Sequence, residues 1–350
     1  MRLKLTYLKS LDGVRCFAII IVLLFHCFYG TLKGGWLGVD LFFVLSGYLI
    51  TSLLEIEIAN TKKLSFKKFY IRRLLRLLPP LLVCILLANI LWSYTNPGNP
   101  NRYLASLAAF FYFANLTPDV LGSLSHLWSL SVEEHFYFIW PALIFYLISK
   151  LKFSHRIYFI LLLIVLVSAL RLFLFNYDGV ISYGIFRIDT YRFTFTRIDC
   201  MLIGAVLAYC QLNGVSFFNN SKLNYKALLL LVMMLFTVLL FTLDKDSRLF
   251  NNGGFLFTNL LCGLFVLAAI NLPEYGLLTN KVARWVGMRS YGIYIYHPPI
   301  FFFFERFREN HSVANLLLIT LIRIAVTLLL VEASYRFIEM PVLKLKSRFK

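Results

Sequence analysis

Ten apolar runs follow one another along this 350-residue chain, and they restrict its fold more than any other feature. A helix of roughly 15 to 25 apolar residues can span the hydrocarbon core of a bilayer. The runs lie near residues 11–29, 37–57, 74–94, 135–149, 157–175, 198–212, 226–243, 255–271, 288–304 and 314–339. The sequence therefore predicts an all-α polytopic membrane protein with about ten transmembrane helices in a single bundle.

No hydrophilic stretch after the last run could form a second domain. We therefore expect residues 1–350 to form a single transmembrane domain with no soluble domain. The run at 104–116 is shorter than the others, and it predicts a re-entrant or interfacial segment or an eleventh span. The first run lacks a small-residue cleavage site, so it is expected to be a retained span rather than a signal peptide.

Positive charge is distributed unevenly between the two sides of the predicted bundle. With both termini placed in the cytoplasm, 23 of the 35 lysines and arginines lie on the cytoplasmic side and nine on the outer side. The positive-inside rule favours this orientation. The formal net charge of +18 thus reflects topology, and nucleic-acid binding is not expected because no soluble basic face remains.

The cysteines and histidines give no sign of a metal site. None of the six cysteines belongs to a C-x-x-C pair, and each lies within or beside an apolar run, as small core residues do. The six histidines lack the spacings that place two metal ligands on one helix. No metal is therefore expected.

Two ionisable residues, Arg15 and His26, interrupt the first apolar run. Their spacing of eleven residues places them on one helix face, about 16 Å apart along the axis. Ionisable groups inside a membrane are candidate functional groups. The alternative is a snorkelling arginine and a core histidine with a satisfied hydrogen bond.

The second run follows a glycine-rich segment and contains polar residues of its own. Gly34 and Gly35 precede Asp40, and Ser46 lies within the apolar part. Glycines at these positions permit a tight turn and a close approach of two backbones. Ordinary packing of small residues between helices is the alternative explanation.

A basic segment joins the second and third runs. Arg73 and Arg76 are three residues apart, so they face the same way at the start of a helix, where such a pair can bind phosphate. Arg72 gives an alternative register. The same charges also fit the positive-inside rule and contact with anionic lipid.

The outer loop before the fourth run ends in two adjacent carboxylates. Ser131 and Glu134 fit a capping box that starts a helix. Glu133 would then lie near the second helical position, where the helix dipole keeps a carboxylate ionised. It could act as a base or as a partner for an imidazole.

Further polar residues lie in the later runs. Arg197 and Asp199 are expected to pair at the outer surface and to orient the loop there. Arg323 lies well inside the last run and is expected to face the bundle rather than lipid.

Ser290 and His297 are seven residues apart and share one face of the predicted ninth span. Pro298 and Pro299 are expected to interrupt the helix just beyond them. A buried structural histidine is the alternative to a functional one at His297.

These motifs together resemble one family. Arg15-x10-His26, Gly34-Gly35 and Phe42-Phe43-x-x-Ser46-Gly47 are similar to elements of the acyltransferase-3 family, integral membrane enzymes of bacteria that O-acetylate cell-envelope sugars. The R-x-x-R pair, WSLSVEEH at 128–135, R-x-D-x-x-x-x-G from Arg197, the Ser290 to His297 segment and the closing Y-x-x-x-E-x-P follow in the same order. His135 departs from the family pattern, which has glutamine there. The resemblance covers about residues 11–341.

The resemblance implies an O-acetyltransferase of the bacterial plasma (inner) membrane that uses acetyl-CoA. The acceptor would be a sugar hydroxyl of an envelope polysaccharide, a lipopolysaccharide O-antigen or a lipid-linked glycan. His26 and Glu133 would be catalytic, and Arg15, Arg73 and Arg76 would bind the donor. The supporting or substrate-binding residues would be Gly34, Gly35, Asp40, Ser46, Trp128, Glu134, Arg197, Asp199, Ser290, His297 and Arg323.

Two other classes of protein are open to the sequence. A transporter or flippase of lipid-linked sugars would also have about ten spans, but it would more naturally show repeat symmetry between its halves. A structural membrane scaffold would not explain the ionisable residues in the apolar runs, since each costs roughly 2 to 3 kcal/mol to insert at mid-bilayer.

Overall fold

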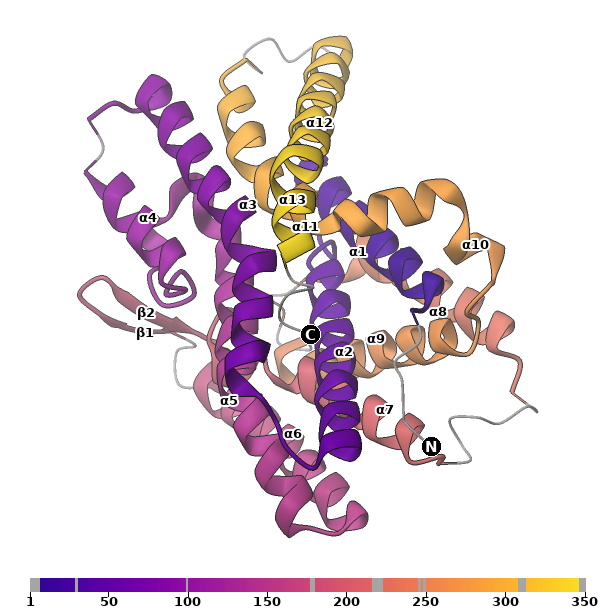
Figure 1. The fold of residues 1–350 in the computed structure, drawn as a ribbon. Coiled ribbons are helices and arrows are strands. Elements are labelled where there is room, and N and C mark those ends of the chain that lie inside the picture. Colours follow the sequence, from indigo (N-terminus) through magenta and orange to yellow (C-terminus); the bar gives the residue numbers. More distant parts are fainter. Residues whose placement is uncertain are drawn as a thin grey trace. The chain divides into compact units, whose positions relative to one another are not determined.

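The protein is built almost entirely of helices. The computed structural model describes residues 7–28, 31–98, 100–176, 180–215, 223–244, 247, 250–307 and 313–345, and Figure 1 shows the elements. The α-helices are α1 Lys9–Cys27, α2 Leu37–Thr61, α3 Phe66–Thr95, α4 Asn101–Phe110, α5 Trp128–Lys150, α6 Phe153–Asn176, α7 Asp199–Leu212, α8 Tyr225–Thr242, α9 Phe255–Ile270, α10 Gly276–Thr279, α11 Lys281–Glu305, α12 Val313–Ser334 and α13 Met340–Leu345. Short 3-10 or π segments are η1 Pro118–Val120, η2 Gly122–Leu127, η3 Thr194–Thr196, η5 Phe250–Gly254 and η6 Tyr335–Glu339.

Each of the ten predicted apolar runs coincides with a helix, the last with α12 and η6 together. Within the described ranges, six helices are long and apolar enough to cross a membrane: α1, α2, α3, α6, α8 and the helical stretch Ala314–Leu345. This confirms a helical, multi-pass membrane protein. The helices α7 and α9 are apolar but have 14 and 16 residues, or about 21 and 24 Å at 1.5 Å per residue, so the count of ten spans stays a prediction.

The short helix α4 corrects one alternative for the run at 104–116. Its ten residues are about 15 Å long, which is half of a bilayer core, so this run is not an eleventh span. Ala105, Ala108 and Ala109 are buried on one side of α4, whereas Tyr103 and Leu107 are exposed on the other.

A two-stranded sheet, β1 Val180–Tyr183 and β2 Phe186–Asp189, is the exception to the predicted all-α fold. The sequence here is rich in β-branched and aromatic residues, which favour strands. Gly184 has a φ of +58°, the left-handed conformation that a tight hairpin turn requires.

The chain forms two compact units. Unit 1 comprises Met1–Leu64, Val132–Ile181 and Ile188–Met288, and unit 2 comprises Ser65–Ser131, Ser182–Arg187 and Arg289–Lys350. The single transmembrane domain stays a prediction.

Glycines allow the helices of unit 1 to approach closely. A Cβ atom on Gly47 of α2 would lie 2.0 Å from the carbonyl oxygen of Met201 in α7, and one on Gly204 of α7 would lie 2.0 Å from that of Val44. Only glycine fits at such distances. These two glycines therefore place α2 directly against α7, the helix that carries Asp199.

In unit 2, α11 continues through Pro298 and Pro299 to Glu305, so the predicted interruption is wrong. A proline removes the N–H that would bond the carbonyl four residues earlier, which for Pro299 is that of Ile295. That carbonyl accepts instead from Cys84 Sγ at 3.0 Å and from His126 Nε2 at 3.1 Å. Replacement donors of this kind let a membrane helix keep a proline.

This arrangement predicts energetic coupling between His126 and Pro299. His126→Ala should destabilise the protein by about 1 to 3 kcal/mol, because it removes a donor from a buried carbonyl. In a Pro299→Ala background, the alanine N–H can bond the Ile295 carbonyl, so His126→Ala should cost less. A double-mutant cycle of melting temperatures in detergent measures this coupling, and strictly additive effects would contradict it.

Candidate functional site

The structure brings together two residues from separate motifs, Ser46 of α2 and Glu133 of α5. The Ser46 hydroxyl donates to Glu133 Oε1 at 2.7 Å, and both side chains are partly exposed. A hydroxyl that donates to a carboxylate favours its ionised form. The sequence predicted each residue as part of the site, but not their contact.

The capping box predicted for Ser131 and Glu134 is wrong. Helix α5 begins at Trp128, before Ser131, whose hydroxyl donates to the Leu127 carbonyl at 3.2 Å inside the helical region. Glu133 is consequently the sixth residue of α5 rather than the second. The helix dipole acts mainly on the first turn, so it is the Ser46 hydroxyl that holds this carboxylate.

His26 lies at the end of α1 and is partly buried. Its Nδ1 lies 2.8 Å from the carbonyl oxygen of Val22, one turn earlier. Because a carbonyl only accepts hydrogen bonds, Nδ1 carries the hydrogen in this contact. Nε2 of the neutral ring therefore holds the lone pair, as a general base or a nucleophile must.

The glycines predicted to form a turn support the segment after His26. A Cβ atom on Gly35 would lie 2.1 Å from Phe25, the residue before His26, and one on Gly34 would lie 2.3 Å from the Leu239 carbonyl oxygen. The predicted close approach of two backbones is confirmed at Gly34, whereas Gly35 packs against the side chain of Phe25.

Arg15 lies one turn into α1. It donates to Asp12 Oδ1 at 2.8 Å and keeps 19% of its side chain exposed, whereas Asp12 keeps 2%. Asp12 also accepts from the Tyr7 hydroxyl. Arg15 is thus held by a buried carboxylate but still accessible to a ligand.

Four charged residues form a buried network in unit 1. Arg197 donates to Asp40, and Arg171 donates to Asp199 at 2.5 Å. All four side chains are at most 3% exposed, so the predicted surface position of Arg197 and Asp199 is wrong. Asn259 of α9 also donates to Asp199, at 3.0 Å.

This network joins α2, α6, α7 and α9, and its burial leaves little room for substrate. We therefore assign Asp40, Arg197 and Asp199 a structural role. Arg171 was not predicted as a site residue, although a charge in an apolar run is a signal that could have identified it.

The predicted residues of unit 2 are mostly buried as well. His297 is fully buried, with Nδ1 2.9 Å from the Ile293 carbonyl oxygen, and Ser290 is 4% exposed. Arg323 is 1% exposed and lies 4.4 Å from the ring centre of Phe301. Arg323 thus faces protein, and these three residues support the helices rather than line an accessible site.

The remaining predicted residues differ in exposure. Trp128 is buried in unit 2, and Glu134 is partly exposed in unit 1. On α3, Arg73 is partly exposed and Arg76 is exposed, and Arg76 interacts electrostatically with Glu339. Arg73 and Arg76 are thus accessible to a soluble ligand.

Comparisons with known proteins identify the class. The profile of the acyltransferase domain family, acyltransferase-3, matches residues 8–332. The chain therefore belongs to the acyltransferase-3 family.

Relatives among characterised proteins agree with this class. The O-acetyltransferase OatA of Staphylococcus aureus, in strain NCTC 8325 and in strain COL, is 32% identical over 361 residues. These alignments cover 97% of this chain and 57% of each relative. The chain thus spans less than two thirds of the length of these relatives. Other Staphylococcus aureus relatives are 31% identical to this chain, and the alignment covers 58% of their length. No solved structure gives a significant match.

The buried network predicts a large difference between two ion pairs. Asp199→Ala leaves Arg171 buried without its carboxylate, and it should cost about 3 to 5 kcal/mol. The matched control Asp119→Ala breaks the exposed pair with Arg187, whose side chains are 62% and 38% exposed, and should cost about 0 to 1 kcal/mol. Melting temperatures in detergent measure both, and equal losses would contradict the structural role of the network.

Proposed function

We propose that this protein is an integral membrane O-acetyltransferase. It moves an acetyl group from acetyl-CoA to a sugar hydroxyl of an envelope polysaccharide, an O-antigen or a lipid-linked glycan. Membership of the acyltransferase-3 family and the relatives named O-acetyltransferase support the reaction class. The observation that carries the site is the Ser46–Glu133 hydrogen bond, which unites two separate motifs.

In this proposal, side-chain exposure distinguishes the residues that act on substrate from those that support the fold. His26, Glu133, Ser46 and Arg15 are partly exposed, whereas the Asp40–Arg197 and Arg171–Asp199 pairs are buried. A group that acts on substrate must be reachable by it. His26 and Glu133 are thus the catalytic pair in this proposal.

The chemistry follows from the tautomer of His26. Nε2 removes the proton of the acceptor hydroxyl while the hydroxyl oxygen attacks the thioester carbonyl carbon. The carbon–sulfur bond breaks, and the imidazolium returns the proton to the leaving thiolate. Glu133, held by Ser46, stabilises the imidazolium. In the alternative order of steps, Nε2 itself attacks the thioester carbonyl carbon and displaces the thiolate. The resulting acyl-histidine then passes the acetyl group to the acceptor hydroxyl.

Two groups of residues are proposed to bind donor phosphates: Arg15 in unit 1 and, separately, the Arg73–Arg76 pair in unit 2. These three side chains are partly or fully exposed, and guanidinium groups bind phosphate through paired hydrogen bonds. The positive-inside rule favours a cytoplasmic position for all three residues and for both termini. CoA is available there, while the acceptor would be reached from the outer side.

Family membership favours acyl transfer over the transporter alternative. The profile match over residues 8–332 and the relatives named O-acetyltransferase support this preference.

Loss of the base should abolish acetylation. In cells that depend on this protein for glycan acetylation, His26→Ala should lower the acetyl content of the glycan by about 100-fold or more, since a general base contributes that much. Glu133→Gln should also lower it. The exposed His155 supplies the matched control, and His155→Ala should retain wild-type acetylation. Mass spectrometry of the glycan measures the result, and full acetylation in His26→Ala at equal protein level would refute the assignment.

Loss of the arginine pair should weaken donor binding. Arg73→Gln combined with Arg76→Gln should raise the KM for acetyl-CoA by about 10-fold or more, since hydrogen bonds to charged groups contribute about 1.5 to 3 kcal/mol. The control Arg187→Gln removes a partly exposed arginine predicted to lie on the outer side, and its KM should not change. Binding of radiolabelled acetyl-CoA to purified protein provides a second readout. Undiminished binding by the double variant would exclude this donor site.

A further inference from the structure

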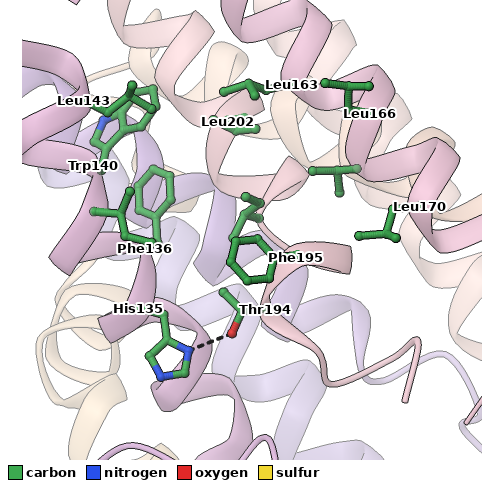
Figure 2. A pocket seen from close by; sticks show the side chains of 13 residues that line it. His135, Phe136, Trp140, Leu143, Leu163, Leu166, Leu170, Thr194, Phe195 and Leu202 are labelled. Atoms are coloured by element: carbon green, nitrogen blue, oxygen red, sulfur yellow. Dashed lines mark hydrogen bonds between the residues drawn. The ribbon is translucent and has the colours of Figure 1, made fainter. Parts of the chain in front are cut away.

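Unit 1 contains a cavity of about 320 Å³ that the proposed reaction does not use. It is formed by α5, α6, η3 and α7, and Figure 2 shows the side chains that line it. Its walls are almost entirely hydrocarbon, including Leu143, Leu163, Leu166, Leu170 and Leu202. Such a cavity selects an apolar ligand.

The polar side chains lie at one end of this cavity (Figure 2). Nδ1 of His135 and the hydroxyl of Thr194 are 2.7 Å apart, and both residues line the cavity. Trp140 also lines it, but its indole N–H donates to Thr51 at 2.8 Å. The cavity is therefore amphipathic, with a long apolar part and one hydrogen-bonding end.

Apolar side chains that line the cavity are exposed at the protein surface, as side chains in contact with a bilayer would be. Leu166 of α6 is 54% exposed and Ile139 of α5 is 48% exposed, and α6 is one of the helices able to span a membrane. A hydrocarbon chain enters such a cavity from the bilayer without leaving an apolar environment. A water-soluble ligand such as a free sugar would lose hydration and find polar partners at one end only.

We propose that this cavity binds one hydrocarbon chain of a membrane lipid, with the polar head of that lipid at His135 and Thr194. The imidazole and the hydroxyl can hydrogen-bond a phosphate or ester oxygen. Two lipid classes carry this chemistry, a phospholipid with its acyl chain and an isoprenyl phosphate with its isoprenoid chain. The proposal does not depend on the acetyl-transfer function.

Photocrosslinking tests the site directly. The full-length protein in nanodiscs receives a trace of phosphatidylglycerol with a diazirine on its acyl chain, or a diazirine-labelled isoprenyl phosphate in a parallel arm. After irradiation, peptide mass spectrometry should find adducts concentrated on the cavity residues of α5, α6 and η3. Higher labelling by one probe than by the other identifies the lipid class.

Two substitutions on the same helix form the decisive comparison. Leu166→Trp fills the cavity and should lower labelling there about tenfold, because it displaces at least two methylene groups. Leu162→Trp is the matched control, since Leu162 is 53% exposed, against 54% for Leu166, and does not line the cavity. Labelling in the control should equal that of wild type. If Leu166→Trp fails to fold, Ile139→Trp fills the cavity from α5.

The polar end has its own test. His135→Ala should lower labelling at the cavity, whereas His135→Gln keeps a side chain that can donate a hydrogen bond and should retain most of it. Labelling spread evenly over the bilayer-facing helices, or unchanged in both cavity-filling variants, would show ordinary surface lipid and overturn the proposal. Because none of these readouts uses acetyl transfer, their failure would leave the proposed reaction untouched.

Discussion

The buried charges of unit 1 are the constraint on which the helix packing of that unit depends. Asp40, Arg171, Arg197 and Asp199 would each be costly to place alone in an apolar interior. The four residues form two ion pairs, and Asn259 is bonded to Asp199. These contacts require α2, α6, α7 and α9 to keep one relative arrangement. Their contribution is thus to specify the arrangement of the helices, because burying the charges stabilises little by itself.

Close helix packing makes this network possible. Gly47 and Gly204 let the backbones of α2 and α7 touch, and this contact places Asp40 within reach of Arg197. The same helix α2 carries Ser46, which holds Glu133 of α5. Helix α2 therefore carries both the buried Asp40 of the network and the partly exposed Ser46 of the proposed site.

In unit 2, the buried polar group that needs a partner is a backbone carbonyl. Two successive prolines in α11 remove backbone donors. Pro299 has no N–H to donate to the Ile295 carbonyl, which accepts from Cys84 and His126 instead. A histidine in a motif next to Trp128 thus acts as a structural donor. In a membrane protein a buried polar group needs a partner whether or not it takes part in catalysis, so its presence alone does not indicate chemistry.

The sequence by itself determined the membrane class, the position of ten helices, the family and the candidate residues, because apolar runs and motif spacings are local properties. It placed Ser131 in a cap, Pro299 at a helix break and Arg197 at the surface, and all three were wrong. The second and third depend on partners distant in the chain, because Cys84 and His126 bond the Ile295 carbonyl and Asp40 accepts from Arg197. The first depends on where α5 begins, which is Trp128. Only the tertiary structure decided which polar residues are partnered in the core and which remain accessible. The cost of burying a polar group is set by its neighbours in space and not by its neighbours in sequence.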